Sequence, residues 1–145
     1  MSDILEIDGA VGEGGGQILR SSLTMSLITG KPFRMKNIRA KRKNPGLAPQ
    51  HLSAIQSAAM ISASEVEGAH VGSQDLTFSP GTVSAGNYCF QVNTAGAMPL
   101  VFQTVALPLA LTQKKSRCDF RGGTHVPWAP PFEYLAHVWG NVVNG

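Results

Sequence analysis

The residues best suited to chemistry stand near the N-terminus, where Gly12, Gly14, Gly15 and Gly16 surround Glu13. Glycine has no Cβ, so such a backbone can approach a ligand closely. The apolar pattern of residues 18–28 predicts a helix directly after this loop, and the first N–H groups of a helix are free to bind an anion. A short apolar run before the loop, residues 4–7, predicts a strand. Strand, glycine loop and helix together are typical of a phosphate site.

This layout alone leaves an alternative open, because glycines also permit tight packing of a strand against a helix. The loop is not a Walker A motif, since it lacks the Gly-Lys-Ser/Thr sequence. Gln17 also stands where the dinucleotide fingerprint would have its last glycine. For Glu13, the hypothesis is a carboxylate that holds Mg²⁺ or Mn²⁺ against a phosphate. The alternative is a surface residue that interacts with the helix dipole.

Seven cations and no acid lie between Lys31 and Lys43, a pattern that suits phosphates or nucleic acid but also occurs on solvated faces. Arg20 lies in the first turns of the predicted helix, and Arg39 and Arg42 follow a predicted strand over residues 33–38. If the two strands point the same way, these guanidinium groups converge on the glycine loop, where they suit phosphate. Surface ion pairs are the alternative.

Two further polar positions are candidates. Gln50 and His51 begin a second predicted amphipathic helix over residues 47–62, whose apolar face is expected to carry Leu52, Ile55, Ala59 and Met60. Histidine can bind phosphate or metal or transfer protons. Gln103 is a polar residue within the apolar helix predicted for residues 100–111, so its amide needs a partner from the protein or from a ligand. A structural histidine and a backbone contact of Gln103 are the alternatives.

The order of elements predicts an α+β fold. Strands are expected at 4–7, 33–38, 66–67, 69–71, 76–78, 88–92 and 116–120, and a last helix at 132–143. The helices at 18–28 and 100–111 each follow a strand and a turn of small residues, which predicts repeated β-α-β-α-β-β units with the helices on one face of a mixed sheet. The first unit covers residues 1–85, and the second, at 86–145, is incomplete. An exposed sheet edge is therefore expected to favour a homo-oligomer.

Composition favours a cytoplasmic globular protein. The 145 residues are 43% hydrophobic, and their mean hydropathy is close to zero. No stretch reaches the roughly 18 apolar residues that span a bilayer, and the N-terminus lacks the pattern of a signal peptide. Cys89 and Cys118 lack metal spacing and are expected to be reduced, structural thiols.

The motifs taken in order closely resemble RNA 3′-terminal phosphate cyclases, from Ile4 to about Trp139. The segments that carry the resemblance are residues 13–20 (EGGGQILR), 38–42 (IRAKR), 45–47 (PGL), 50–52 (QHL), 67–69 (EGA), 94–96 (TAG), Gln103, 122–124 (GGT) and 129–131 (APP). The resemblance implies a large domain of repeated units like the C-terminal domain of translation initiation factor 3. It also implies an enzyme that uses ATP and a divalent metal to convert an RNA 3′-phosphate into a 2′,3′-cyclic phosphate.

The resemblance implies roles for individual residues. Glu13 is similar to the family's metal-contacting acid, and Gln103, Pro130 and Pro131 are similar to positions that line its adenylate pocket. Arg20, Arg39, Arg42, Gln50 and His51 resemble the polar residues that bind phosphates and RNA.

Family members are more than twice as long as this chain, and their adenylated histidine lies in the C-terminal part that has no counterpart here. The chain alone is therefore expected to be inactive, as a truncated form or fragment of a cyclase. A non-catalytic nucleotide- or RNA-binding relative, acting in RNA processing or ribosome biogenesis, is the alternative.

Overall fold

The computed structural model describes residues 3–91 and 98–121, which form an α+β fold of three helices and six strands. The elements, in chain order, are β1 (Leu5–Asp8), α1 (Gln17–Thr29), β2 (Phe33–Lys36), α2 (Pro49–Ser62), β3 (Glu65–Glu67), β4 (Leu76–Ser79), β5 (Asn87–Gln91), α3 (Met98–Ala110) and β6 (Arg117–Arg121).

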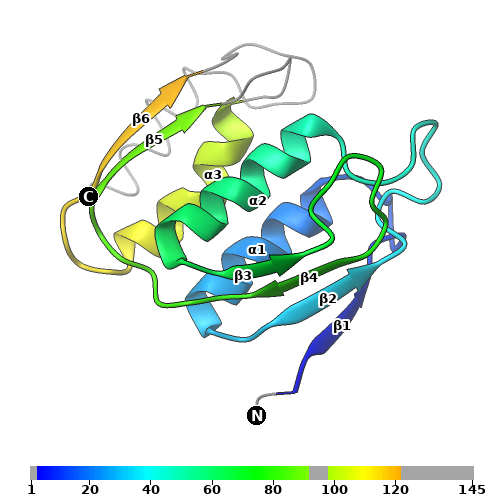
Figure 1. Ribbon diagram of the computed structural model, residues 1–145, viewed down its shortest axis with the longest axis horizontal. Helices are drawn as coiled ribbons and strands as arrows, with labels where there is room; N and C mark the ends of the chain where they lie inside the picture. Colours follow the sequence, from blue (N-terminus) through cyan, green and yellow to red (C-terminus); the bar gives the residue numbers. More distant parts are fainter. Residues whose placement is uncertain (1–2, 92–97, 122–145) are drawn as a thin grey trace.

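The first six elements are four strands and two helices, and the strands form a mixed sheet with the order β1-β2-β4-β3. β1 and β2 are parallel, with Leu5 opposite Phe33, whereas β4 is antiparallel to both of its neighbours. A parallel pair needs a crossover connection, which α1 provides. α1 and α2 lie on the same face of this sheet (Figure 1), as the sequence predicts.

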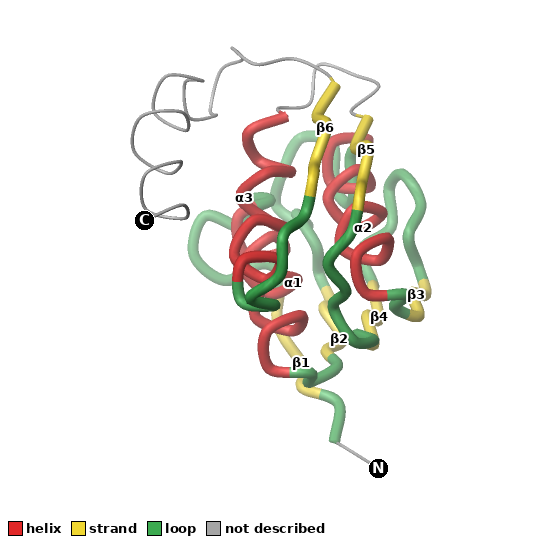
Figure 2. The backbone as a smooth tube through the Cα atoms, turned by 90° about the vertical axis from the view of Figure 1, so that its left-hand side faces the viewer, coloured by secondary structure: helices red, strands yellow, loops and turns green. Residues whose placement is uncertain are grey.

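β5 and β6 form a second, parallel sheet of two strands, and α3 connects them. The three helices pack against one another and lie between the two sheets (Figure 2). A side-chain hydrogen bond joins the two halves, because the Thr24 hydroxyl on α1 donates to the Thr104 carbonyl on α3 at 2.9 Å. The β1-α1-β2 and β5-α3-β6 segments thus share the same order and the same parallel pairing.

Alternation along β2 places the core as predicted. Phe33 and Met35 are at most 2% exposed, and Ile38 after the strand is buried as well, while Arg34 and Lys36 point to the other face. On the helical side, α1 contributes Leu19, Leu23 and Leu27. Burial of these apolar side chains on folding stabilises the stacking of helix on sheet.

Three expectations about the elements need correction. Residues 69–71 form a turn rather than a strand, because Gly68 and Gly72 on either side adopt left-handed φ angles of 83° and 84°. The second helix begins at Pro49 rather than at residue 47. Its buried face runs through Ala54, Ile55, Ala58 and Ile61, so Met60, expected in the core, is instead 51% exposed. The apolar pattern of this helix fits two faces, and the other one meets the sheet.

Other expectations concern the membrane, the two thiols and the C-terminal segments. No helix within residues 3–91 and 98–121 is long and apolar enough to cross a membrane. Cys89 and Cys118 are both free thiols. The predicted helix at 132–143, the segment 94–96, and Pro130 and Pro131 lie outside the described residues. The domain boundaries and the self-association through a sheet edge stay predictions.

A candidate anion and nucleotide site

The loops that follow β1 and β2 come together at one end of the sheet, because these strands are parallel. A Cβ atom placed on Gly15 would lie 2.9 Å from Nη2 of Arg42. A Cβ atom on Gly16 would collide with the His51 imidazole and lie 2.8 Å from Nη1 of Arg20. The glycine loop therefore lies against side chains from α1, α2 and the turn after β2, and at Gly16, where the neighbour is a buried imidazole, only glycine leaves room.

The loop ends in the first turn of α1. Gly14 has a left-handed φ of 61°, a conformation that glycine adopts without strain. Gly16 is the N-cap residue, and no side chain caps the helix, while the Arg20 N–H makes the first helical bond to the Gly16 carbonyl at 3.1 Å. The amide groups of the first turn are thus available to an anion next to the Arg42 and Arg20 guanidinium groups.

His51 is the buried centre of this site, with 2% of its surface exposed. Its Nδ1 accepts the backbone N–H of Ala48 at 2.9 Å, so the side chain caps α2 from the third helical position. Burial, and then the charges of Arg39 and Arg20, lower the pKa of His51 to about 4. The imidazole is therefore neutral at pH 7, and with Nδ1 as acceptor its proton is on Nε2, beside Gly16.

Arg20 has a buried hydrogen-bond donor that no described residue uses. Its Nη2 donates to Gln17 Oε1 at 3.1 Å, but the buried Nε–H finds no acceptor among the described residues. Burial lowers the pKa of Arg20. A buried donor without a partner costs free energy, so an acceptor that entered this site would bind favourably.

Arg39 and Arg42 have different surroundings. The Nη1 of Arg39 donates to the carbonyls of Asn44 at 3.1 Å and Gly46 at 2.6 Å, which ties together the turn after β2. Burial, followed by the charge of Arg42, lowers the pKa of Arg39. Arg42 is exposed and lies directly against the glycine loop. Arg42 is thus the more available of the two for a ligand.

A cavity of about 320 Å³ lies between α1 and α3, next to the anion site. Gln103 lines it from α3, and Arg20 lines it from α1. The remaining lining residues are Gln17, Ser21, Thr24, Met25 and Thr104. Arg20 thus borders both this cavity and Gly16.

Glu13 and Gln50 are less defined by their surroundings. Glu13 is exposed in the loop, and within residues 3–91 and 98–121 no three acidic, histidine or cysteine side chains gather in a metal-binding cluster. A single carboxylate still fits Mg²⁺, which often binds through one or two carboxylates plus substrate phosphates. Gln50 is half-buried in the first turn of α2.

Comparison with known proteins assigns the chain. Residues 11–145 match the family described as RNA 3′-terminal phosphate cyclase. The chain belongs to this family. An RNA 3′-terminal phosphate cyclase of Ectopseudomonas mendocina is 53% identical over 137 residues, which cover 94% of this chain and 40% of that protein. The cyclase of Archaeoglobus fulgidus is 50% identical over 135 residues, covering 93% of this chain and 41% of the relative.

The chain spans about two fifths of the length of these curated cyclases. The motifs in the sequence do not reveal two features of the site. One is the cavity shared by Arg20 and Gln103, which depends on how α3 packs on α1. The other is the capping bond of His51, for which its place at the third helical position was the available signal.

Proposed function

We propose that this chain is part of an enzyme that uses ATP to convert an RNA 3′-phosphate into a 2′,3′-cyclic phosphate. It would contribute the site that binds the RNA 3′ end and part of the site that binds the nucleotide. The observation that carries the proposal is the convergence of Arg20, Arg42 and His51 on Gly15 and Gly16. Family membership supports the reaction type that we propose, in which ATP is converted to AMP. The coarser conclusion, an RNA 3′-terminal phosphate cyclase domain, does not depend on these details.

The terminal phosphate would lie at the glycine loop. A phosphate monoester there meets guanidinium groups of Arg20 and Arg42, the N–H groups at the start of α1, and the Nε2–H of His51. Each of these groups donates, and hydrogen bonds to a charged partner are the stronger kind. A neutral histidine also suits this place, because it donates without adding a third positive charge to a buried site.

The nucleotide would occupy the cavity between α1 and α3, with Gln103 next to the adenosine and Arg20 next to its phosphate. Pro130 and Pro131, which lie outside the described residues, stay candidates for contact with the adenylate by family resemblance alone. Glu13 would hold Mg²⁺ or Mn²⁺, which would supply positive charge to offset that of the transferring group. Gln50 and Arg39 would help to bind the RNA.

In this reaction the adenylyl group of ATP is first transferred to an oxygen of the RNA 3′-phosphate with loss of pyrophosphate, and the neighbouring 2′-hydroxyl then attacks the RNA phosphorus. The new O2′–P bond forms while the P–O bond to AMP breaks; AMP leaves with the electron pair, and the hydroxyl proton passes to solvent. Arg20 and Arg42 would stabilise the charge on the non-bridging oxygens during the attack. Positioning of the two groups supplies most of the remaining acceleration.

His51 is an unsuitable nucleophile for adenylation. A neutral imidazole has one free lone pair, and that of His51 accepts the Ala48 N–H. We therefore expect this chain, incubated alone with labelled ATP and Mg²⁺, to acquire no covalent AMP on a denaturing gel. An AMP band that disappears in His51→Gln would overturn this assignment.

We further infer that the β1-α1-β2-α2-β3-β4 order is one complete unit, and that β5-α3-β6 begins a second. The support is that α1 starts at Gln17 and α3 at Met98, each between two parallel strands. Two such units would place Gln103 of the second next to Arg20 of the first. This arrangement would explain why one pocket takes residues from both.

The test of the function is selective binding of a 3′-phosphate. Calorimetry compares uridine 3′-monophosphate with uridine, using the wild type, Arg42→Gln and the control Lys114→Gln. We expect the phosphate to bind tighter by at least about tenfold, as one charge-assisted hydrogen bond contributes about 1.5–3 kcal/mol. Arg42→Gln should lose most of this preference and the control should keep it. Equal binding of both ligands to the wild type would refute the proposal.

A further inference from the structure

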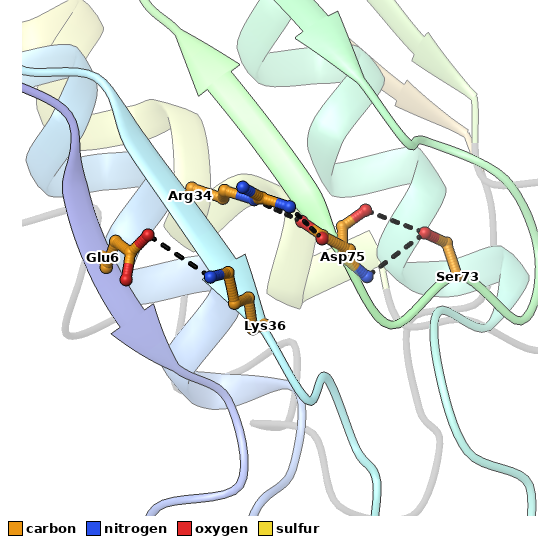
Figure 3. A network of polar contacts seen from close by, with 5 residues as sticks. All are labelled: Glu6, Arg34, Lys36, Ser73 and Asp75. Atoms are coloured by element: carbon orange, nitrogen blue, oxygen red, sulfur yellow. Dashed lines mark hydrogen bonds and ion pairs between the residues drawn. The ribbon is translucent and has the colours of Figure 1, made fainter.

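Five of the seven cations after the first helix form two groups that the sequence does not distinguish. On β2, Arg34 binds Asp75 through two hydrogen bonds of 3.0 and 2.6 Å, and Lys36 reaches Glu6 at 3.3 Å. Figure 3 shows these ion pairs on the outer face of the sheet, where Ser73 also holds the Asp75 backbone. The charges on the strand are therefore largely neutralised within the fold.

The turn that follows β2 differs, and we call residues 41–43 the basic turn. Lys41, Arg42 and Lys43 are consecutive and exposed, and none of them forms an ion pair with a residue that the structure describes. One carboxylate, that of Asp8, lies close enough for the charge of Lys41 to affect its pKa. Asp8 is already bound by the Ala10 N–H at 3.0 Å and by Asn37 Nδ2 at 3.3 Å, and these two bonds lower its pKa more than Lys41 does.

The basic turn is also held in a fixed shape. Asn37 and Arg39 adopt left-handed φ angles of 59° and 49°, and the Arg42 N–H donates to the Arg39 carbonyl at 3.0 Å. The Arg39 side chain closes the turn from within through the carbonyls of Asn44 and Gly46. A closed turn with three exposed cations loses less backbone entropy than a flexible one when it binds a polyanion.

We propose that Lys41 and Lys43 bind backbone phosphodiesters of the RNA that lie on the 5′ side of its terminal phosphate. The proposal rests on the proposed function, in which Arg42 and the glycine loop hold that terminal phosphate. The two lysines are the direct chain neighbours of Arg42, so they flank the residue that contacts Gly15. The chain would thus bind a 3′-terminal strand of several nucleotides more tightly than a single nucleotide.

The test compares ligands of different length. Fluorescence anisotropy measures a ten-residue oligouridylate with a 3′-phosphate and the same oligomer with a 3′-hydroxyl, and calorimetry measures uridine 3′-monophosphate. The variant is Lys41→Gln/Lys43→Gln. The matched control is Lys114→Gln/Lys115→Gln, which removes the same charge from the connection between α3 and β6, at the other end of the molecule (Figure 1).

Two lost phosphate contacts on a single strand should lower the slope of log affinity against log salt concentration by about 1.4. Relative to 1 M salt, this corresponds to a loss of about 25-fold in affinity at 0.1 M salt. We expect this change for both oligomers in the Lys41/Lys43 variant, no change for uridine 3′-monophosphate, and none in the control. An unchanged slope, or an equal loss for the mononucleotide, would overturn the inference. If the lysine effect is present but the 3′-phosphate gives no advantage over the 3′-hydroxyl, Lys41 and Lys43 bind RNA phosphodiesters, but the proposed function fails, and with it their placement next to a bound terminal phosphate.

Discussion

As the pH falls, protonation of His51 should lower the free energy of unfolding of this chain more steeply than protonation of its carboxylates alone would. The folded pKa is about 4, below the ordinary value of 6.5, so the unfolded chain binds more protons between these values. Stability is thus complete above the ordinary pKa and is lost as the pH falls toward the folded one. At about 1.4 kcal/mol for each pKa unit, the loss between pH 7 and pH 4 is about 3 kcal/mol.

The variant His51→Gln isolates this effect. Glutamine at the third helical position can still accept the Ala48 N–H, as in a capping box, but it does not titrate. Urea unfolding at pH 7 and pH 4, in a chloride buffer without phosphate, gives the free energy of unfolding for both proteins. Asp8 and Asp75, whose pKa values are lowered chiefly by hydrogen bonds from the Ala10 backbone and Arg34, titrate in both proteins and cancel in the comparison.

The wild type should lose about 3 kcal/mol more than His51→Gln over this range. Any constant packing cost of glutamine lowers both values of the variant and leaves this difference intact. If the two proteins lose the same free energy, His51 is not a buried neutral group, and its assignment as a donor to the phosphate fails as well. Sulfate, a dianion throughout this range, should reduce the difference if it binds beside the imidazole and favours its charged form.

Three further predictions concern the loop and the helix contact. Gly16→Ala should destabilise the chain by about 1–3 kcal/mol in urea unfolding, because the new methyl group meets the buried imidazole, whereas Gly15→Ala meets only a flexible, exposed guanidinium and should have a much smaller effect. Glu13→Ala should abolish any dependence of ATP affinity on Mn²⁺ without lowering the melting temperature; if Mn²⁺ does not affect ATP binding to the wild type, the metal role is wrong. Thr24→Val should cost about 1 kcal/mol by breaking the α1–α3 bond. Thr29→Val, which breaks exposed bonds to the Met25 carbonyl and from the Lys31 N–H, should cost less.

The sequence predicts most of the fold because its local signals agree with the tertiary contacts. Alternation along residues 33–36 marks a strand with one buried face, and Gly30 and Pro32 end the preceding helix. The prediction fails at residues 69–71 and at Met60, where the pattern is short or fits two faces. There the outcome depends on Gly68 and Gly72, and on which side of α2 meets the sheet, neither of which an apolar pattern determines.

The sequence predicts where the site lies once the relative direction of β1 and β2 is assumed. Arg20 and Arg42 come together at the glycine loop if β1 and β2 are parallel, and a helix between two adjacent strands makes that the expected pairing. What each cation does there is decided by distant residues. Asp75 lies 41 positions from Arg34, and no local pattern announces that it will pair with that guanidinium.

Three neighbouring arginines therefore have three different surroundings. Arg34 is paired with a carboxylate, Arg39 donates to the carbonyls of its own turn, and Arg42 is exposed against Gly15. Guanidinium groups whose charge is neutralised, or whose donors are occupied, have less to offer a phosphate than one that is exposed and unpaired. Within this basic segment, phosphate binding should accordingly depend most on Arg42 and its two lysine neighbours, although the sequence presents all seven cations alike.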